Sequence, residues 1–129
     1  MMSLFEKIPN KQPCETVHES SDVWPELGMS FELNMFYKQY SNAEGWLGEG
    51  YLMMWTRNEI EEFRGSTMEA YPEKYHFFAS DGGGSQFGFV VDKGGISYVS
   101  APDIGGEEDI RVLGNWHQFL SSIELGDYI

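Results

Sequence analysis

Apolar residues recur at helical spacing in two segments of the chain. In SFELNMFYKQYSN, residues 30–42, Ser30 stands where an N-cap belongs and precedes an apolar face at positions i, i+3, i+4 and i+7. Near the end of the chain, Asn115 can cap another helix, and Gln118 follows at the spacing of a capping box. The two predicted apolar faces consist of Leu33, Phe36, Tyr37 and Tyr40 and of Trp116, Phe119, Leu120 and Ile123.

Two other segments have helical features. ETVHESSDVWPELG, residues 15–28, is a weak helix candidate because a proline interrupts it. Thr56 and Glu59 have the spacing of a capping box. They predict a short acidic helix through Phe63, with Ile60 and Phe63 as its inward-facing pair.

Alternating apolar residues predict short strands in the middle of the chain. The candidates are YLMMW (51–55), YHFFAS (75–80), SQFGFVVD (85–92), ISYVS (96–100) and part of the acidic segment EEDIRVL (107–113). In two of them the alternation defines one face, which consists of Tyr75, Phe77 and Ala79 and of Phe87, Phe89 and Val91. Glycine-rich segments predict a turn at NAEGWLGEG (42–50) and a hairpin at DKGGI (92–96).

This order of elements predicts an α+β fold. We expect a single domain with a mainly antiparallel sheet of short strands, flanked by N-terminal helices and a C-terminal helix. A length of 129 residues suits one domain, with residues 1–14 as a loosely held N-terminal arm and residues 15–129 as the domain. The single cysteine, Cys14, excludes an internal disulfide and a zinc site built from cysteines.

The strong negative charge narrows the range of partners. The formal net charge is −13, and an acidic surface is repelled by nucleic acids and by anionic membranes, so we expect neither as a partner. The charge either keeps the protein soluble or steers a basic protein toward it. The chain shows no signal-peptide pattern and no apolar run long enough to span a bilayer, which indicates a cytoplasmic protein. The oligomeric state stays open.

The segment SDGGGSQFGF, residues 80–89, has three candidate roles: a phosphate cradle, a tight turn or a bare backbone surface for a partner. A cradle needs a helix after the glycines and a nearby cation, but a strand pattern follows and Asp81 would repel phosphate. We therefore predict a turn in which Asp81 accepts hydrogen bonds from the turn's own N–H groups. A Gly83→Val substitution is expected to lower the melting temperature.

Histidines and carboxylates form no assembled catalytic pattern in the sequence. The candidates are His18 with Asp22, His117 with Ser121, Glu61 with Glu62, and Glu107-Glu108-Asp109. Two ligands four residues apart are common by chance, a serine–histidine pair needs an orienting acid and an oxyanion hole, and acidic clusters usually form solvated surface. We therefore expect no enzymatic activity, no cofactor and no metal site.

Trp46 lies in the glycine-rich segment EGWLGEG and allows two interpretations. A tryptophan on a loop can anchor an interface, because its contact area is large and it loses little rotamer entropy on binding. Alternatively, it packs over the edge of the sheet. The candidate partner-binding residues are therefore Trp46, Asp81, Gly82, Gly83, Gly84, Glu107, Glu108 and Asp109.

Three motifs together resemble the SUKH superfamily, which contains fungal Smi/Knr cell-wall-synthesis regulators and bacterial toxin-immunity proteins. The first is an apolar strand that ends in tryptophan and continues into a short acidic helix, at residues 52–63. The second is the S-D-G-G-G turn before an aromatic strand, at residues 80–89. The third is the capped C-terminal helix that begins at residues 115–120. The family's first helix usually begins with Leu-Pro, where this chain has Met29-Ser30.

The resemblance implies a non-enzymatic binding domain. For a bacterial protein of this kind it implies an immunity protein that binds and neutralises a cognate toxin, and the charge suits a basic toxin such as a nuclease. The fungal members imply a second hypothesis, a scaffold or regulatory domain in cell-envelope or signalling assembly. A small hydrolase that uses Glu61, Glu107 and Asp109 is a third.

Overall fold

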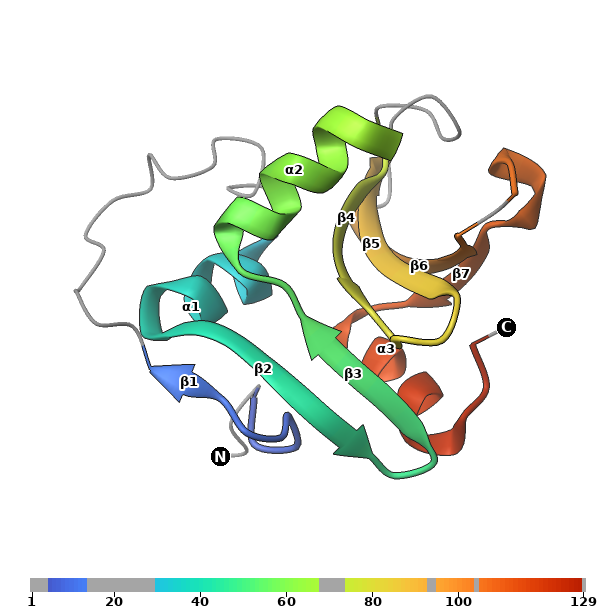
Figure 1. The fold of residues 1–129 in the computed structure, drawn as a ribbon. Helices are drawn as coiled ribbons and strands as arrows, with labels where there is room; N and C mark the ends of the chain where they lie inside the picture. Colours follow the sequence, from blue (N-terminus) through green and yellow to red (C-terminus); the bar gives the residue numbers. More distant parts are fainter. Residues whose placement is uncertain (1–4, 14–29, 68–73, 93–94, 104, 129) are drawn as a thin grey trace.

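A computed structural model describes residues 5–13, 30–67, 74–92, 95–103 and 105–128 (Figure 1). These residues form one seven-stranded antiparallel sheet in which the strands lie in chain order. The strands are β1 (Gln12–Pro13), β2 (Tyr40–Leu47), β3 (Gly50–Met54), β4 (His76–Ser80), β5 (Ser85–Asp92), β6 (Gly95–Pro102) and β7 (Arg111–Gly114). The helices are α1 (Phe31–Gln39), α2 (Arg57–Thr67) and α3 (Trp116–Leu125).

The predicted α+β class with an antiparallel sheet is confirmed. The helices, however, are distributed along the chain: α1 precedes β2, α2 stands between β3 and β4, and α3 follows β7. The candidate helix at residues 15–28 lies outside the described residues, as do residues 93 and 94 of the predicted hairpin. On either side of those two residues, β5 and β6 pair with Asp92 opposite Gly95.

The caps predicted for α1 and α3 are confirmed. Ser30 Oγ accepts a hydrogen bond from the Leu33 N–H at 3.4 Å, which begins α1. Asn115 and Gln118 form a reciprocal capping box at the start of α3, with N···O distances of 2.8 and 2.9 Å. The helix α1 ends one residue before Tyr40, which is extended and begins β2.

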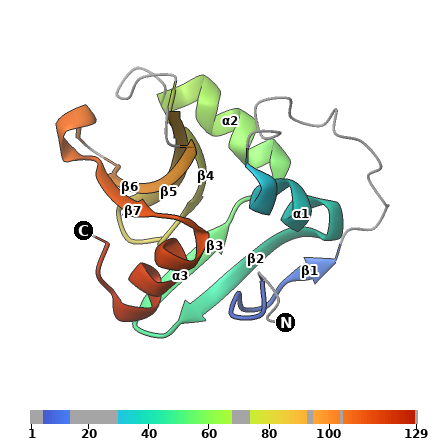
Figure 2. The ribbon, with the colours of Figure 1, turned by 180° about the vertical axis from the view of Figure 1, so that it is seen from behind.

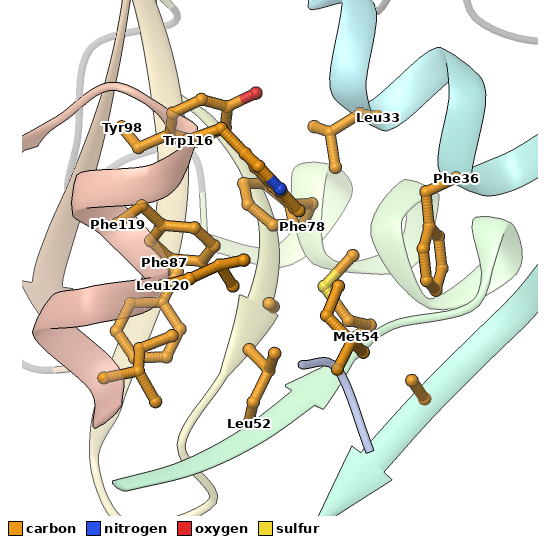
Figure 3. Close-up of a cluster of buried hydrophobic side chains, with 14 of the residues drawn as sticks. Leu33, Phe36, Leu52, Met54, Phe78, Phe87, Tyr98, Trp116, Phe119 and Leu120 are labelled. Atoms are coloured by element: carbon orange, nitrogen blue, oxygen red, sulfur yellow. The ribbon is translucent and has the colours of Figure 1, made fainter. Parts of the chain in front are cut away.

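One aromatic cluster fills the space between the sheet and the helices α1 and α3. Figure 2 shows α3 in front of the curved sheet, and Figure 3 shows side chains of both helices pointing toward the strands. Tyr98 of β6 is at the centre of this cluster: its ring stacks on Phe119 and contacts Trp116 and Phe78 edge-on. The labelled members are Leu33, Phe36, Leu52, Met54, Phe78, Phe87, Tyr98, Trp116, Phe119 and Leu120.

The helix α2 joins this cluster, which we name the main cluster, to a second, smaller cluster around the buried residues Phe77 and Ala101. Its capping box is confirmed, because the Thr56 N–H donates to Glu59 Oε1 at 2.8 Å and the Glu59 N–H donates to Thr56 Oγ1 at 3.2 Å. Ile60 is buried in the main cluster, and Phe63 packs on Trp55 and Phe77. The helix continues four residues past Phe63, its predicted end, to Thr67.

The strand β4 departs from simple alternation. Phe77 lies opposite Gly88 and Ala79 lies opposite Phe87, so Phe78 is an extra residue and forms a bulge. As a result Tyr75 and Phe77 belong to the second cluster, whereas Phe78 and Ala79 belong to the main cluster. The expected common face of Tyr75, Phe77 and Ala79 is therefore wrong for Ala79. The common face of Phe87, Phe89 and Val91 in β5 is confirmed.

The predicted turn at residues 42–50 is wrong, because most of this segment belongs to β2. The register places Leu47 opposite Gly50, so the turn is reduced to Gly48 and Glu49. Gly45 serves a different purpose. An added Cβ there would lie 2.8 Å from Asn10 Nδ2 and 3.0 Å from the Pro9 side chain, so this glycine lets the N-terminal segment approach β2 closely.

The N-terminal segment is not loosely held over its described part, residues 5–13. Phe5 and Ile8 are buried in the main cluster, and β1 pairs with β2. Lys11 Nζ donates to the carbonyl oxygens of Phe5 and Ile8 at 3.0 and 2.9 Å, which closes this segment on itself. The expected arm is thus part of the packed domain, because its two apolar residues find a place beside α1 and α3.

Candidate functional site

Four side chains stand together on the outward face of β2 and β3, and we name them the β2–β3 patch: Glu44, Trp46, Tyr51 and Met53. Trp46 lies directly opposite Tyr51, and Glu44 lies directly opposite Met53. Their neighbours along the strands, such as Leu47 and Leu52, point the other way and are buried. The patch is therefore the solvent face of a hairpin whose other face belongs to the core.

The β2–β3 patch is ordered by contacts among its own members. The Trp46 and Tyr51 rings meet edge-on with their centroids 5.2 Å apart, and the Tyr51 hydroxyl donates to Glu44 Oε2 at 2.7 Å. This hydrogen bond raises the pKa of Tyr51 and holds the Glu44 carboxylate beside the ring. Even so, 69% of Trp46 is exposed. Trp46 thus packs on a neighbouring strand with part of its ring and leaves the rest to solvent, and its role as an interface anchor stays a prediction.

The segment DGGG, residues 81–84, is a tight connection between β4 and β5, as predicted, and we name it the glycine turn. Asp81 Oδ1 accepts hydrogen bonds from the N–H groups of Gly83 and Ser85 at 2.8 and 3.0 Å, which confirms its predicted role. The other carboxylate oxygen accepts from the Tyr128 hydroxyl at 2.9 Å. Asp81 thus ties the turn to the end of the chain.

The three glycines of this turn are not equivalent. Gly82 and Gly84 have φ angles of +74° and +117°, which side chains rarely tolerate, whereas Gly83 does not have a positive φ. An added Cβ at Gly83 would lie no closer than 3.8 Å to any neighbouring atom. The structure therefore gives no reason for Gly83→Val to lower the melting temperature through a strained turn, and we expect that loss for substitutions at Gly82 and Gly84.

Gly84→Ala is expected to lower the free energy of unfolding by about 1–3 kcal/mol, because it forces a side chain into a sparsely populated backbone conformation. The matched control Gly83→Ala is expected to change it by less than about 0.5 kcal/mol. Urea denaturation of both variants measures the difference. Equal losses in the two variants would contradict the backbone assignment.

The glycine turn adjoins the β2–β3 patch. An added Cβ at Gly82 would lie 3.0 Å from Met53 Sδ and 3.9 Å from the Tyr51 ring. Met53 also pairs with Ser80 at the end of β4, directly before the turn. The structure thus brings two separately predicted features, Trp46 and the glycines, onto one continuous surface.

The acidic segment Glu107–Asp109 forms a 3-10 helical turn, which we name the acidic turn, and its three residues are exposed. Glu107 pairs with Lys74 at 3.4 Å and accepts from the Tyr75 hydroxyl at 3.3 Å. Asp109 Oδ2 accepts from the Gly106 N–H at 3.0 Å. The prediction of an acidic loop followed by a short strand is confirmed, since β7 follows at once.

A hollow of about 270 Å³ lies between the glycine turn and the acidic turn. It is lined by Ser85, Ser100, Ala101, Pro102, Asp109, Arg111 and Tyr128. Arg111 is paired with Asp127 at 2.9 Å, and the Ser100 hydroxyl donates to the Tyr128 carbonyl. Asp109 and Tyr128 thus line the same hollow, whereas Glu107 pairs with Lys74.

Tyr128 makes the site sensitive to alkaline pH. Burial, followed by the hydrogen bond to Asp81, raises the pKa of Tyr128 from 10.0 to about 12. The unfolded chain loses this proton first, so the stabilisation is complete below pH 10 and is lost as the pH rises from 10 to about 12. Denaturant unfolding at pH 9, 10, 11 and 12 should show a steeper loss in the wild type than in Tyr128→Phe. Identical pH profiles would contradict this role for Tyr128.

Several residues of the site escaped prediction from the sequence. Glu44, Tyr51 and Met53 join the patch only through the pairing of β2 with β3, and Tyr128 reaches Asp81 across 47 residues. One signal in the sequence could have indicated Tyr51 and Met53, because they alternate along β3 with the buried Leu52.

Within the described part of the chain, no group of three or more His, Cys, Asp or Glu side chains could hold a metal ion. Nor is any described helix long and apolar enough to cross a membrane.

Comparison with known families finds no family model that matches the chain, and comparison with curated proteins finds no match. The resemblance to the SUKH superfamily therefore rests on the order and spacing of the three motifs.

Proposed function

We propose that this protein is a non-enzymatic binding domain of the SUKH type that acts in the cytoplasm as an immunity protein. It binds a cognate toxin and neutralises it. The observation that carries the proposal is the exposure of Trp46, 69% of which faces solvent on an ordered strand. A tryptophan held in place by its neighbours but left open to solvent is a typical anchor of a protein interface.

The charge supports a basic partner. The net charge of −13 attracts a basic protein over distances of about one Debye length, roughly 8 Å at physiological salt. Toxins that cleave nucleic acids need basic surfaces to hold phosphates, so a nuclease fits both the charge and the resemblance. Fast, charge-steered association is useful to an antidote, which must bind before the toxin acts.

The three motifs that carry the resemblance fall on elements around the proposed surface. Residues 52–63 span most of β3, the connection and the first seven residues of α2, and residues 80–89 contain the glycine turn. Residues 115–120 begin α3, which supports the core side of β3. The proposed binding surface consists of the β2–β3 patch and the adjoining glycine turn.

Co-expression with toxin-domain genes encoded beside this chain tests the proposal. Cells that carry the toxin and the wild-type protein should grow, whereas cells that carry the toxin alone should not. A stable complex with a neighbouring protein that gives no protection would favour a scaffold role instead. Failure to protect against every neighbouring toxin candidate, with soluble protein present, would overturn the proposal.

The acidic turn leads to a separate prediction, which concerns the rate of association with the toxin. Replacing Glu107, Glu108 and Asp109 together by Gln, Gln and Asn keeps hydrogen-bond acceptors at these positions but removes three negative charges. If the turn faces the incoming toxin, association should slow and its dependence on salt should flatten, with a smaller change in dissociation. Stopped-flow or biosensor kinetics from 50 to 300 mM salt measure both rates. An unchanged association rate would place the docking surface away from this turn.

A further inference from the structure

We propose that the β2–β3 patch binds an arginine side chain of the partner protein. This inference rests on the proposed function, and it names the chemical group that the exposed surface recognises. The patch offers two aromatic rings and one carboxylate within a four-residue area of the sheet. These are the groups that a planar guanidinium binds best.

The two rings provide the stacking surface. Trp46 and Tyr51 are oriented at 82° to each other, so the edge of one ring meets the face of the other and the pair holds its geometry without a ligand. Trp46 is 69% exposed, so it has ring area available to a guanidinium. Indole is the most favourable of the aromatic side chains for a cation.

Glu44 provides the charge. Its Oε2 already accepts the Tyr51 hydroxyl at 2.7 Å, which fixes the carboxylate beside the rings. In the described part of the chain, Glu44 Oε1 takes part in no side-chain hydrogen bond or ion pair, so it is available to an incoming N–H donor. The described ion pairs join other carboxylates, those of Glu124, Glu107 and Asp127.

The same features disfavour other occupants. A purely apolar partner would bury the Glu44 carboxylate without a counter-charge, which is unfavourable. A nucleic acid would bring phosphates to a carboxylate on a chain of net charge −13. A lysine ammonium is compact and strongly hydrated, so it stacks on indole less well than a guanidinium. Charge complementarity and ring geometry therefore select arginine.

A peptide titration followed by NMR tests this assignment on the intact protein. The probe is an acetylated peptide of alternating glycine and arginine, compared with the same peptide carrying citrulline or lysine. Citrulline keeps the planar shape of arginine but lacks its charge. The readout is the indole N–H signal of Trp46 in ¹⁵N-labelled protein, identified by its absence in Trp46→Phe. The arginine peptide should shift this signal saturably, and citrulline should bind at least about 3-fold more weakly.

Variants distinguish binding of the peptide at the β2–β3 patch from its general attraction to an acidic protein. Glu44→Gln is expected to weaken arginine-peptide binding about 2- to 5-fold, and Tyr51→Phe, which releases Glu44, to have a smaller effect in the same direction. Glu62→Gln removes an equal charge from an exposed position on α2, outside the patch, and should leave the Trp46 shift unchanged. Trp46→Phe should retain weaker binding, followed through the backbone signals of β3.

Three outcomes would overturn the inference. These are equal binding of the arginine and citrulline peptides, equal effects of Glu44→Gln and Glu62→Gln, or a concentration-dependent dimer whose formation Trp46→Ala abolishes. The last result would assign the patch to a second copy of this chain. If the protein protects against a toxin while the peptide leaves Trp46 unmoved, the inference fails and the proposed function stands. A saturable Trp46 shift in a protein that gives no protection would support the arginine site and count against the immunity role.

Discussion

Replacing Tyr98 by phenylalanine is expected to lower the free energy of unfolding by about 1–3 kcal/mol, although the change removes a single oxygen atom. The Tyr98 hydroxyl lies 2.8 Å from Ser30 Oγ and donates to Glu32 Oε1 at 2.7 Å. Ser30 is fully buried at the N-cap of α1, so loss of its partner leaves a polar group in the core. Tyr98 thus connects β6 to the start of α1.

Tyr98→Ala is expected to have a larger effect, about 3–5 kcal/mol, because it also empties the centre of the aromatic cluster. The matched control is Tyr75→Phe, since the Tyr75 hydroxyl donates to Glu107 at 3.3 Å in a hydrogen bond that is exposed. That control should change stability by less than about 0.5 kcal/mol. Guanidinium unfolding followed by circular dichroism measures all three variants. A Tyr98→Phe loss no greater than that of Tyr75→Phe would refute the buried link to Ser30.

Trp46→Ala is expected to weaken binding of the cognate toxin by about 2 kcal/mol or more, which is roughly 30-fold in Kd, because an exposed tryptophan anchor contributes strongly at the centre of an interface. The folded state should lose less than about 1 kcal/mol, since the substitution removes one exposed cross-strand pair. This variant is therefore expected to lose most of its affinity for the toxin while keeping most of its stability.

Two other exposed apolar residues serve as controls for Trp46. Phe31 and Leu125 are 62% and 72% exposed and lie on α1 and α3, outside the β2–β3 patch. Phe31→Ala and Leu125→Ala should leave the Kd within about 2-fold of the wild type, as expected for surface positions outside the interface. Titration calorimetry with each variant gives the comparison. If either control weakens binding as much as Trp46→Ala, the interface is not centred on the patch.

The sequence predicts best those elements that rest on local signals. In α3, the cap at Asn115, the partner Gln118 and the apolar stripe lie within nine residues, and every part of that prediction is confirmed. The strand β5 is similar, because its alternation alone decides which side chains face the core. Neither element depends on contacts with distant parts of the chain.

The sequence fails where distant contacts determine the local structure. Glycine content predicts a turn at residues 42–50, yet Gly45 is needed because Pro9 and Asn10 pack against β2. The bulge at Phe78 is also set by pairing with β5 and not by the composition of β4. A pattern within one segment contains no information about such neighbours.

The candidate site was predictable in its parts but not in its assembly. The type of residue identifies Trp46 and the glycines, but which face of β2 carries the indole follows from the register with β3. Glu44 gains its place only because Tyr51, diagonally across the two strands, donates to it. The contact between Gly82 and Met53 likewise requires the pairing of β3 with β4.

The proposed immunity role can be tested by titration calorimetry of the purified protein with the purified toxin domain encoded beside it. We expect a 1:1 complex with a Kd below roughly 1 μM at physiological salt, tighter at low salt, in which the activity of the toxin is abolished. No detectable heat of binding, with both proteins folded, or a complex in which the toxin stays fully active, would contradict the immunity role.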